Sequence, residues 1–505
     1  MDINNNEMIF ARAADKIRVP VCDKTLLTEL SDDFTLPDYR AEIRRLLKIT
    51  ASLPAPSVYT GGGSAEFSGD AVYHVLYVGG DGKLCSVDLT SMYEAAAELE
   101  GDEREELRAF DETEIESIVG RVTAPRKLNI RCRLRHRITA SAERAIDVET
   151  SGSTEDGIVR LAETCPVVET VYADDDSGEI VEMLNGVTDP RVAFSDATVL
   201  MSQVSPRQGG ILCSGNLLLC VFSESEEGEL HRTDRKLPFE SVIPADISGD
   251  GWDCRAWGCA SEIRTEPAAN GLECRIRLSL FGEAQRNMPV KLTRDIYSTR
   301  QSCEVESEEI EAAVAEYCGI GNFTVSGSVE LSGLPENYGT VFATATAEPE
   351  ELVAENGRYI LTGKCRFSAL LGGEEYACRE FELPFRYEFG SVDGNEVGDY
   401  CAKLSCHAVR VRGDGGTLMA DAEISAALRV QSACKLEAVT RASFGEMLDA
   451  EHPLYSVVYV PRGESLWSIA KKYAADPTAV AEANGLRVGA LSSPEALEGV
   501  NFLII

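Results

Sequence analysis

The chain has 505 residues, of which 44% are hydrophobic, so it is long enough for three or four packed domains and its composition does not predict disorder. The formal net charge is −36; residues 455–505 hold four Lys or Arg and five Asp or Glu, a charge of −1, which leaves −35 on residues 1–454. Such a surface repels phosphate groups and anionic lipids, so no nucleic-acid partner and no direct membrane insertion are expected.

The N-terminal residues and the cysteines both predict a cytoplasmic protein. Residues 1–7 contain neither the basic nor the apolar run that starts a secretory signal, and no stretch approaches the roughly 18 apolar residues of a membrane span. The sixteen cysteines are scattered without a CxxC pair, and many occupy apolar strand positions, as Cys274 does. We therefore expect reduced, buried thiols in the cytosol.

Two helices are predicted in the first 110 residues. Over residues 38–49, one face of a helix would carry the side chains of Tyr39, Ile43, Leu46 and Leu47. A looser, acidic helix is expected over residues 93–110. Strand patterns dominate the rest of the chain up to residue 452, which predicts that these helices are exceptions in a mainly β protein.

Internal repetition organises the first 450 residues. Similar strand sequences surround three glycines that are 146 and 148 residues apart, namely Gly69, Gly215 and Gly363. A Leu-Pro-Phe triplet recurs at residues 237–239 and 383–385. A second strand pattern begins near Leu128, Leu272 and Leu418. Three copies of one domain explain these spacings most simply.

Each copy is expected to be a β-sandwich or an open barrel. Its strands alternate apolar and polar residues, as Leu272, Cys274 and Ile276 do with Glu273 and Arg275, which is typical of antiparallel strands with one buried face. The predicted fold is therefore mainly β, with three tandem β-sandwich-like domains before a small βααβ domain. The expected boundaries are 1–165, 166–318, 319–452 and 453–505.

One strand carries an ordered stripe of cations. Lys127, Arg131, Arg133, Arg135 and Arg137 would all lie on one face of a strand. One interpretation is pairing with the chain's own acidic residues at 94–116; the other is docking of an acidic partner or a neighbouring subunit.

The same stripe differs between the copies. Arg275 and Arg277 keep part of it in the second copy, whereas Asp421 and Glu423 reverse its charge in the third. An electrostatic contact between copies is therefore a further interpretation.

The sequence contains few candidates for catalysis. There is no GxxxxGK[ST], HExxH or GxSxG motif, and there are only five histidines. Cys401, Cys406 and His407 come nearest to a metal cluster, but a structural site needs four ligands at ordered spacing, so buried core thiols are the favoured interpretation. We expect no enzymatic activity, no cofactor, no metal site and no catalytic residue.

The last fifty residues predict a small module that begins and ends with a strand. Residues 457–460 are β-branched or aromatic, and Pro461 and Gly463 end this strand in a turn. Residues 502–505 supply the closing strand. The two strands bracket a segment with the pattern of two short helices.

Capping signals mark both of these helices. The first can be capped by Glu464 or Ser465. Its apolar stripe consists of Leu466, Ile469, Ala470 and Tyr473. The second has Asp476 as its cap and Pro477 in its first position, where the missing N–H costs nothing. Its expected inward residues are Val480 and Ala483, and it ends at Asn484 and Gly485.

Residues 459–473, followed by Asn484-Gly485-Leu486, resemble the LysM module. The resemblance implies a shallow groove that binds N-acetylglucosamine polymers, peptidoglycan or chitin. Carried over to this chain, the groove would involve Gly463, Glu464, Ser465 and Leu466 on one side and Asn484, Gly485 and Leu486 on the other. Trp467 lies beside the apolar stripe, either as a packing residue at the helix edge or as an exposed aromatic for a partner or a sugar ring.

Four segments of the repeats resemble the SPOCS (DUF3794) domain of clostridial sporulation proteins. They are residues 36–48, 75–78, 124–127 and 295–298. The resemblance implies a mother-cell protein at the forespore surface, part of the spore coat, whose LysM module contacts a coat morphogenetic ATPase of the SpoIVA type.

The leading hypothesis is a non-enzymatic scaffold of spore coat assembly, with the LysM module as its recognition head. Under this hypothesis, truncation of Trp467, of Leu466 or of the loop around Glu464 should cost the most binding. The alternative is a protein that binds peptidoglycan or another N-acetylglucosamine polymer, with the β domains as a stalk. A hydrolase whose cleft the sequence does not reveal is a third possibility.

Overall fold

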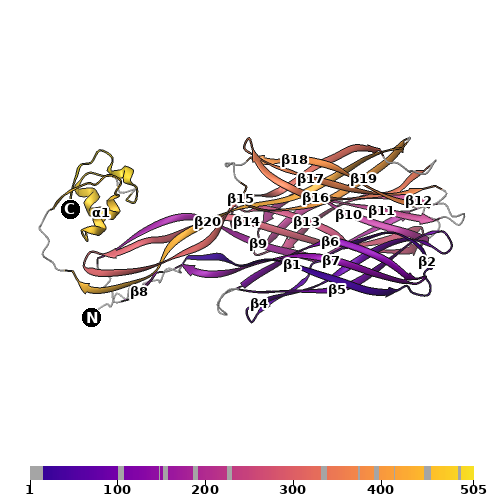
Figure 1. The fold of residues 1–505 in the computed structure, drawn as a ribbon, viewed down its shortest axis with the longest axis horizontal. Coiled ribbons are helices and arrows are strands. Elements are labelled where there is room, and N and C mark those ends of the chain that lie inside the picture. Colours follow the sequence, from indigo (N-terminus) through magenta and orange to yellow (C-terminus); the bar gives the residue numbers. More distant parts are fainter. Residues whose placement is uncertain are drawn as a thin grey trace, which may run out of the picture.

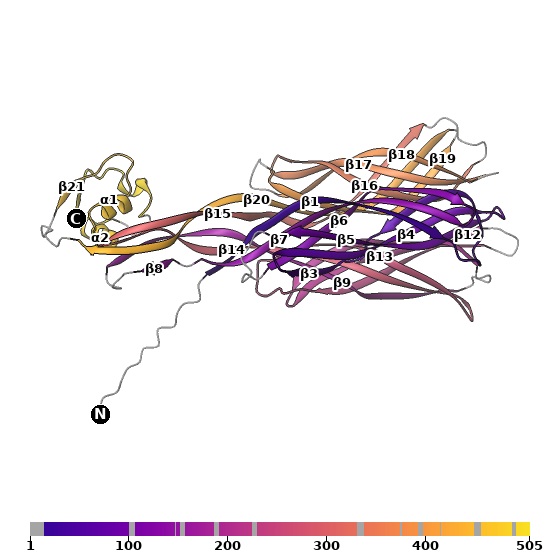
Figure 2. The same ribbon diagram turned by 60° about the horizontal axis from the view of Figure 1, so that its bottom comes forward.

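The computed structural model describes most of the chain. The described residues are 15–99, 107–146, 148–151, 157–185, 191–224, 230–330, 338–373, 376–391, 397–414, 416–448, 456–486 and 491–505. The described part of the protein is mainly β, as expected, and the two short α-helices found there lie in the C-terminal module. Figures 1 and 2 show an elongated molecule in which a broad β body narrows to a stalk, with the module beside the tip of the stalk.

Three copies of one strand arrangement make up the body and the stalk. The first copy contains β1 (Asp15–Thr35), β2 (Ile43–Ser52), β3 (Ser57–Gly61), β4 (Ser64–Gly79), β5 (Leu84–Glu98), β6 (Leu107–Ala124) and β7 (Lys127–Ile146). After the short β8 (Glu149–Ser151), the second contains β9 (Ile158–Asn185), β10 (Arg191–Arg207), β11 (Gly210–Glu224), β12 (Leu230–Pro244), β13 (Asp253–Ala268) and β14 (Gly271–Ser298). The third contains β15 (Gln301–Glu330), β16 (Gly339–Glu355), β17 (Arg358–Gly372), β18 (Ala377–Ser391), β19 (Asp399–Asp414) and β20 (Thr417–Met447).

Each copy has two antiparallel sheets with the same strand order. One sheet places the first, last and penultimate strands of the copy side by side, in the orders β1-β7-β6, β9-β14-β13 and β15-β20-β19. The other joins the intervening strands, as in β10-β11-β12 and β16-β17-β18, with β4 central between β2 and β5 in the first copy. The same strand order therefore recurs three times along the described chain.

The three repeated glycines occupy the central strands β4, β11 and β17. A Cβ atom on Gly215 would lie 2.0 Å from the carbonyl oxygen of Leu200, and one on Gly363 would lie 2.2 Å from that of Glu348. At Gly69 the Tyr93 ring fills the same space, 2.6 Å from a Cβ position. At Gly215 and Gly363 the neighbouring backbone thus approaches too closely for any side chain, whereas at Gly69 the space is occupied by the Tyr93 ring.

The second repeated strand is the centre of the other sheet in every copy. On β14, Leu272, Cys274 and Ile276 are buried, whereas Arg275 and Arg277 are exposed, which confirms the period of two. The thiol of Cys274 is free and fully buried, as expected. The inward faces of the two sheets in a copy pack together into one apolar core, as a sandwich requires.

The copies also share apolar contacts with one another. Leu76 of the first copy, Phe194 and Phe222 of the second, and Phe342 and Leu370 of the third belong to one buried cluster. The ring of Phe342 lies 5.0 Å from that of Phe194 and 5.7 Å from that of Phe222. The cluster buries apolar surface that no single copy could cover.

The stalk is formed by the long first and last strands of the copies. Strand β14 has 28 residues and β20 has 31, and strands of this length span roughly 90–100 Å when straight. Residues of β1, β7, β9, β14, β15 and β20 join in another shared core. These strands therefore carry the fold of the body outward towards the C-terminal module (Figure 2).

The prediction of a helix over residues 38–49 is wrong. Residues from Ile43 onward form β2, which pairs with β4 in an antiparallel register that runs from Ile43 opposite Gly79 to Ser52 opposite Val72. Register shifts after Ile43 and after Leu46 interrupt the alternation of side chains. These irregularities give a strand an apolar spacing that resembles the helical period.

The acidic helix expected over residues 93–110 is also wrong. Tyr93, Ala95 and Ala97 are buried on alternate positions of β5, which pairs with β4, and Leu107 begins β6. Residues 100–106 lie outside the described residues. Alanine and glutamate favour helices, but pairing with β4 and burial of one face outweigh this propensity.

The bounds of the strands show where one copy ends and the next begins. The expected boundaries at 165/166 and 318/319 fall inside β9 and β15, because those strands begin at Ile158 and Gln301. The turn from β14 to β15 spans only Thr299 and Arg300, and Thr299 N–H donates to the carbonyl of Gly157. Adjacent copies are therefore joined without a linker at this point.

A buried ion network ties the three copies together. Glu283 on β14 is fully buried; it accepts a hydrogen bond from Arg255 Nε at 2.7 Å, and Arg429 of the third copy lies 3.5 Å away. Arg429 also lies 3.2 Å from Asp399, which pairs with Arg137 of the first copy at 2.9 Å. A buried charge without its partner costs on the order of several kcal/mol, so the network restricts how the copies meet.

A second set of buried charges links the first and third copies. Lys403 Nζ lies 3.0 Å from Glu112 and 2.7 Å from Glu114 on β6. The Cys401 thiol donates to Glu112 at 2.8 Å. Burial alone would raise the pKa of Glu112, but the positive charges of Lys403 and Arg255 lower it to about 2.

Replacement of Glu112 by glutamine should therefore destabilise the protein. The Glu112→Gln variant leaves Lys403 buried with one counter-charge fewer, and we expect a loss of about 3 kcal/mol in the free energy of unfolding, measured with denaturant. The matched control is Glu350→Gln, which removes an exposed pair with Lys364 and should cause no measurable loss. Equal stabilities for the two variants would contradict the role of the network.

Acid should weaken the same contact. Because the folded-state pKa of Glu112 is depressed to about 2, the unfolded chain binds a proton more readily, and the stabilisation present above about pH 4.5 is lost as the pH falls towards 2. We expect the midpoint of thermal unfolding to fall across this window. The fall should be shallower in Glu112→Gln, and identical slopes in the two proteins would exclude Glu112 as a contributor.

Candidate functional site

The C-terminal module has the predicted order of elements. It consists of β21 (Val457–Tyr459), α1 (Leu466–Lys472), α2 (Pro477–Ala483), a short 3-10 helix η2 (Pro494–Leu497) and β22 (Phe502–Ile504). The two strands pair antiparallel, with Val457 opposite Ile504 and Tyr459 opposite Phe502. The predicted βααβ arrangement is confirmed.

Local side-chain contacts define the start of α1. Ser465 is the N-cap: its hydroxyl accepts from Ser468 N–H at 3.2 Å, and the Ser468 hydroxyl accepts from Ser465 N–H at 3.1 Å. This reciprocal pair is a capping box. Before it, Gly463 has a φ of 84°, a conformation that suits glycine, in the turn between β21 and α1. Of the two proposed caps, the structure uses Ser465, and Glu464 lies in the turn.

The second helix also begins and ends as expected. The Asp476 carboxylate accepts from the N–H groups of Thr478 and Ala479, and Pro477 occupies the first turn. At the other end, Asn484 Nδ2 donates to the carbonyls of Val480 and Ile504. Asn484 Oδ1 accepts from Ile504 N–H at 2.8 Å. Asn484 therefore joins α2 to β22, which is a structural task.

The core of the module is small and contains one of the expected binding residues. Leu466 is almost fully buried with Ile469, Val480 and Leu503. Truncation of Leu466 would remove core packing, so its effect on binding could not be separated from unfolding of the module. Leu466 is therefore a poor probe of a binding surface.

The prediction that Tyr473 and Ala483 are buried in the core of the module is wrong. Tyr473 is exposed because α1 ends at Lys472, which puts the next position of the stripe beyond the last turn. On α2, Ala481 is buried and Ala483 is exposed. The helices are only seven residues long, so their ends differ from an extended helical pattern.

The expected groove residues lie on two surface loops. Gly463 and Gly485 are exposed, have positive φ angles of 84° and 66°, and have open space where a Cβ would be. Glu464 and Leu486 are partly exposed beside them. Residues 487–490, which follow Leu486 in the sequence, lie outside the described residues. In the part that the structure describes, these loops remain accessible to a ligand.

Trp467 is not exposed in this structure. It is 5% exposed, and its Nε1–H donates to Asp295 Oδ2 on β14 at 2.8 Å. The Tyr297 ring packs edge-on against the indole with centroids 5.0 Å apart. Trp467 is thus a packing residue whose contacts come from the stalk, and a role in partner binding stays a prediction.

Two further contacts hold the module to the stalk. Lys471 Nζ lies 2.7 and 2.8 Å from the two oxygens of Asp295. The Tyr297 hydroxyl donates to the carbonyl of Ala475 at 2.7 Å. No local sequence pattern at Asp295 or Tyr297 indicates that they contact residues more than 170 positions later in the chain.

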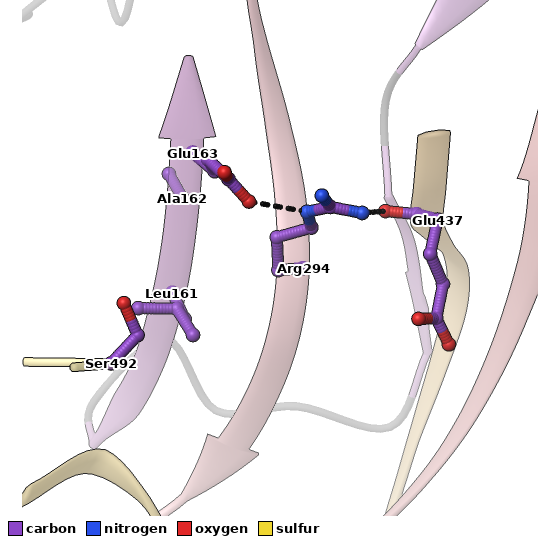
Figure 3. Close-up of a pocket in the computed structure, with 6 residues that line it drawn as sticks. All are labelled: Leu161, Ala162, Glu163, Arg294, Glu437 and Ser492. Carbon is purple, nitrogen blue, oxygen red and sulfur yellow. Dashed lines mark hydrogen bonds and ion pairs between the residues drawn. The ribbon is translucent and has the colours of Figure 1, made fainter. Parts of the chain in front are cut away.

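A polar cavity of about 450 Å³ lies beside this contact. It is lined by Leu161, Ala162, Glu163, Arg294, Glu437 and Ser492, of which Ser492 belongs to the module (Figure 3). Arg294 donates to the Glu163 carboxylate at 2.6 Å and to the Glu437 carbonyl at 2.8 Å. Both hydrogen bonds of the Arg294 guanidinium are made to residues of the stalk. Because Ser492 of the module also lines the cavity, the cavity lies at the junction between module and stalk.

The arginine stripe on β7 is exposed on one face, as predicted. Arg135 Nη2 lies 2.8 Å from Glu114, and Arg133 lies 3.7 Å from Glu116. Arg131 lies exposed on the same face. The stripe is therefore paired in part with the chain's own acidic residues.

Arg137 makes a different contact at the end of the stripe. It pairs with Asp23 of the first copy and with Asp399 of the third. This ion pair is a contact between copies, but it does not involve the reversed charges at Asp421 and Glu423. Arg137 therefore belongs to the network that joins the copies.

The outer face of the β21–β22 pair is apolar and exposed. Tyr459 is 65% exposed and Phe502 60% exposed, and their rings pack edge-on with centroids 5.8 Å apart. Val457 and Ile504 extend the same face. Adjacent exposed aromatic and aliphatic side chains are typical of an interaction surface.

The suspected thiol cluster is part of the core and the ion network. Cys406 Sγ lies 4.0 Å from Cys365 Sγ inside the third copy, and Cys401 accepts from Arg255 Nη1. In the described part of the chain, no group of three or more His, Cys, Asp or Glu is placed to hold a metal ion. None of the helices described is both long and apolar enough to cross a bilayer.

Comparison with known proteins identifies the module alone. No curated protein matches the chain, and no solved structure matches it. The LysM domain family matches residues 458–492, which include most of β21, both α-helices and the exposed positions Gly463 and Gly485. The C-terminal module of this chain is therefore a LysM domain.

Proposed function

We propose that this protein is a non-enzymatic scaffold whose LysM domain binds peptidoglycan or another N-acetylglucosamine polymer. The observation that carries the proposal is the orientation of the domain on the stalk. Trp467 and Lys471 contact the stalk, whereas Gly463 and Gly485 are exposed on the two loops. The docked domain therefore presents its loops to solvent.

The loops suit a carbohydrate chemically. A sugar presents hydroxyl and acetamido groups that need hydrogen-bond partners, and loops without side chains at Gly463 and Gly485 let a ligand approach the backbone. Glu464 adds a carboxylate, which can accept from sugar hydroxyls. The three-copy body then acts as a rigid support that holds this site at the far end of a long stalk.

Replacement of Glu464 by alanine should weaken glycan binding. We expect the dissociation constant for a chitin-type N-acetylglucosamine hexamer to rise about tenfold, because a charge-assisted hydrogen bond is lost. The measurement is isothermal titration calorimetry on the full chain. The matched control is Glu482→Ala, an exposed carboxylate on α2 outside the loops, which should bind as the parent does. Unchanged affinity in Glu464→Ala would remove this loop from the site.

A second candidate function is the assembly of a spore coat. The three repeats followed by a LysM domain are similar in arrangement to SipL, the coat protein that interacts with SpoIVA. Under this proposal the protein lies in the mother-cell cytoplasm at the forespore surface, and its LysM domain binds a SpoIVA-type ATPase. The apolar face of Val457, Tyr459, Phe502 and Ile504 supports a protein partner, because exposed aromatic residues are typical anchors.

The two candidates predict different effects of the exposed aromatic pair. In the variant Tyr459→Ser with Phe502→Ser, binding to a SpoIVA-type ATPase should fall at least tenfold, while binding of the N-acetylglucosamine hexamer should be unchanged. Pulldown and calorimetry measure the two affinities. Retained ATPase binding would argue against this face as the protein contact, and lack of ATPase binding by the parent chain would argue against the coat function.

A further inference from the structure

A bulge at the tip of the stalk aims two side chains at the LysM domain. The register of β14 with β9 shifts between Thr293 and Asp295. Beyond the shift, Asp295 and Tyr297 are two residues apart on one strand and therefore share a face. Both reach the LysM domain, through Trp467 and Ala475. Bulges commonly redirect side chains next to functional sites.

The Asp295 carboxylate is the polar half of this contact. It accepts one hydrogen bond from the Trp467 indole N–H and lies within 2.8 Å of Lys471 Nζ through both oxygens. A buried indole N–H needs an acceptor, and Asp295 supplies it. Hydrogen bonds between charged groups are stronger than neutral ones, so this carboxylate contributes much of the specificity.

Tyr297 is the apolar half. Its ring is buried edge-on against Trp467, and its hydroxyl donates to the Ala475 carbonyl, just beyond the C-terminal end of α1. Asp295 and Tyr297 thus engage α1 with a carboxylate and a ring, and the Tyr297 hydroxyl holds the segment that follows α1. Short peptide segments are commonly recognised in the same way, through one aromatic anchor, here Tyr297, and one charged neighbour, here Asp295.

The contact is also suited to opening. The side chains of Lys471 and Asp295 are 43% and 24% exposed, so salt screens their attraction. The LysM domain is joined to β20 through residues 449–455, and contacts between domains of one chain are commonly weak enough to move. A partner that offers the same groups could therefore compete with the stalk.

We propose that Asp295 and Tyr297 form a latch that closes over Trp467 and Lys471, and that a protein segment presenting a carboxylate beside an aromatic ring displaces it. In the closed state, the face of α1 is occupied by the chain itself. In the open state, Trp467 and Lys471 become a docking surface for that partner. The proposal concerns a different face from the two surface loops that carry Gly463 and Gly485, and it does not depend on glycan binding.

The test uses two neighbouring lysines on α1. Lys471 reaches Asp295, whereas Lys472 lies over the Tyr473 ring on the exposed side. The full chain is labelled with 5-fluorotryptophan, and the ¹⁹F resonance of Trp467, assigned with Trp467→Phe, reports whether the indole is buried. The resonances of Trp252 and Trp257 in the body report whether the fold is intact.

We expect Lys471→Met and Asp295→Asn to move the Trp467 resonance towards its solvent-exposed position, with the open-to-closed ratio raised on the order of tenfold. Lys472→Met should leave it unchanged, and 1 M NaCl should shift the parent chain in the direction of Lys471→Met. A Trp467 resonance that is the same in Lys471→Met, Asp295→Asn and the parent would overturn the latch.

Competition tests the partner chemistry. A peptide of residues 293–298 added to full-length Asp295→Asn should shift the Trp467 resonance back towards the buried position. The same peptide with asparagine in place of its aspartate should bind at least tenfold more weakly. Equal binding of the two peptides, or binding of neither, would refute the proposed recognition of a carboxylate beside an aromatic ring.

Discussion

Glu283 is the charge on which the architecture depends. It is fully buried between Arg255 of its own copy and Arg429 of the third, and Arg429 continues through Asp399 to Arg137 of the first. A carboxylate in this position is tolerated only when its cations are present, and those cations come from strands more than 140 residues apart. The three copies are therefore not independent domains joined by flexible linkers. They must meet in one arrangement for the charges to be satisfied, and the apolar cluster around Phe342 is buried by the same arrangement.

The same strand connects this centre to the LysM domain. Strand β14 carries Glu283 in the body and Asp295 at the stalk tip, twelve residues further on. The ion network fixes the strand at one end, and the bulge before Asp295 directs its side chains at the other. The position of the LysM domain is thus set by the body, although residues 449–455 are its only covalent link to the described strands. A LysM domain supported in this way has one face occupied by the stalk, while Gly463 and Gly485 on its loops stay exposed.

Much of the fold was predictable, because repetition and alternation are local and survive in the sequence. The spacing of Gly69, Gly215 and Gly363 predicts three copies. Both LysM helices are predicted from their cap candidates, which are Glu464 or Ser465 for the first helix and Asp476 for the second. The helices expected over 38–49 and 93–110 were wrong because register shifts in β2 and the pairing of β5 with β4 are properties of partner strands. The environment of Trp467 was out of reach for the same reason: its acceptor lies 172 residues away, and an apolar residue at a helix edge has the same local pattern whether it meets solvent, a ligand or a distant strand.

The central claim is that recognition takes place on the exposed loops of the LysM domain while the three-copy body serves as support. Hydrogen–deuterium exchange of the full chain with and without the N-acetylglucosamine hexamer tests it most directly, because every described segment is observed at once. The account predicts slower exchange in the loops around Gly463 and Gly485 and no change in β1 to β20. Protection that falls on the strands of the body, with none in the two loops, would contradict it.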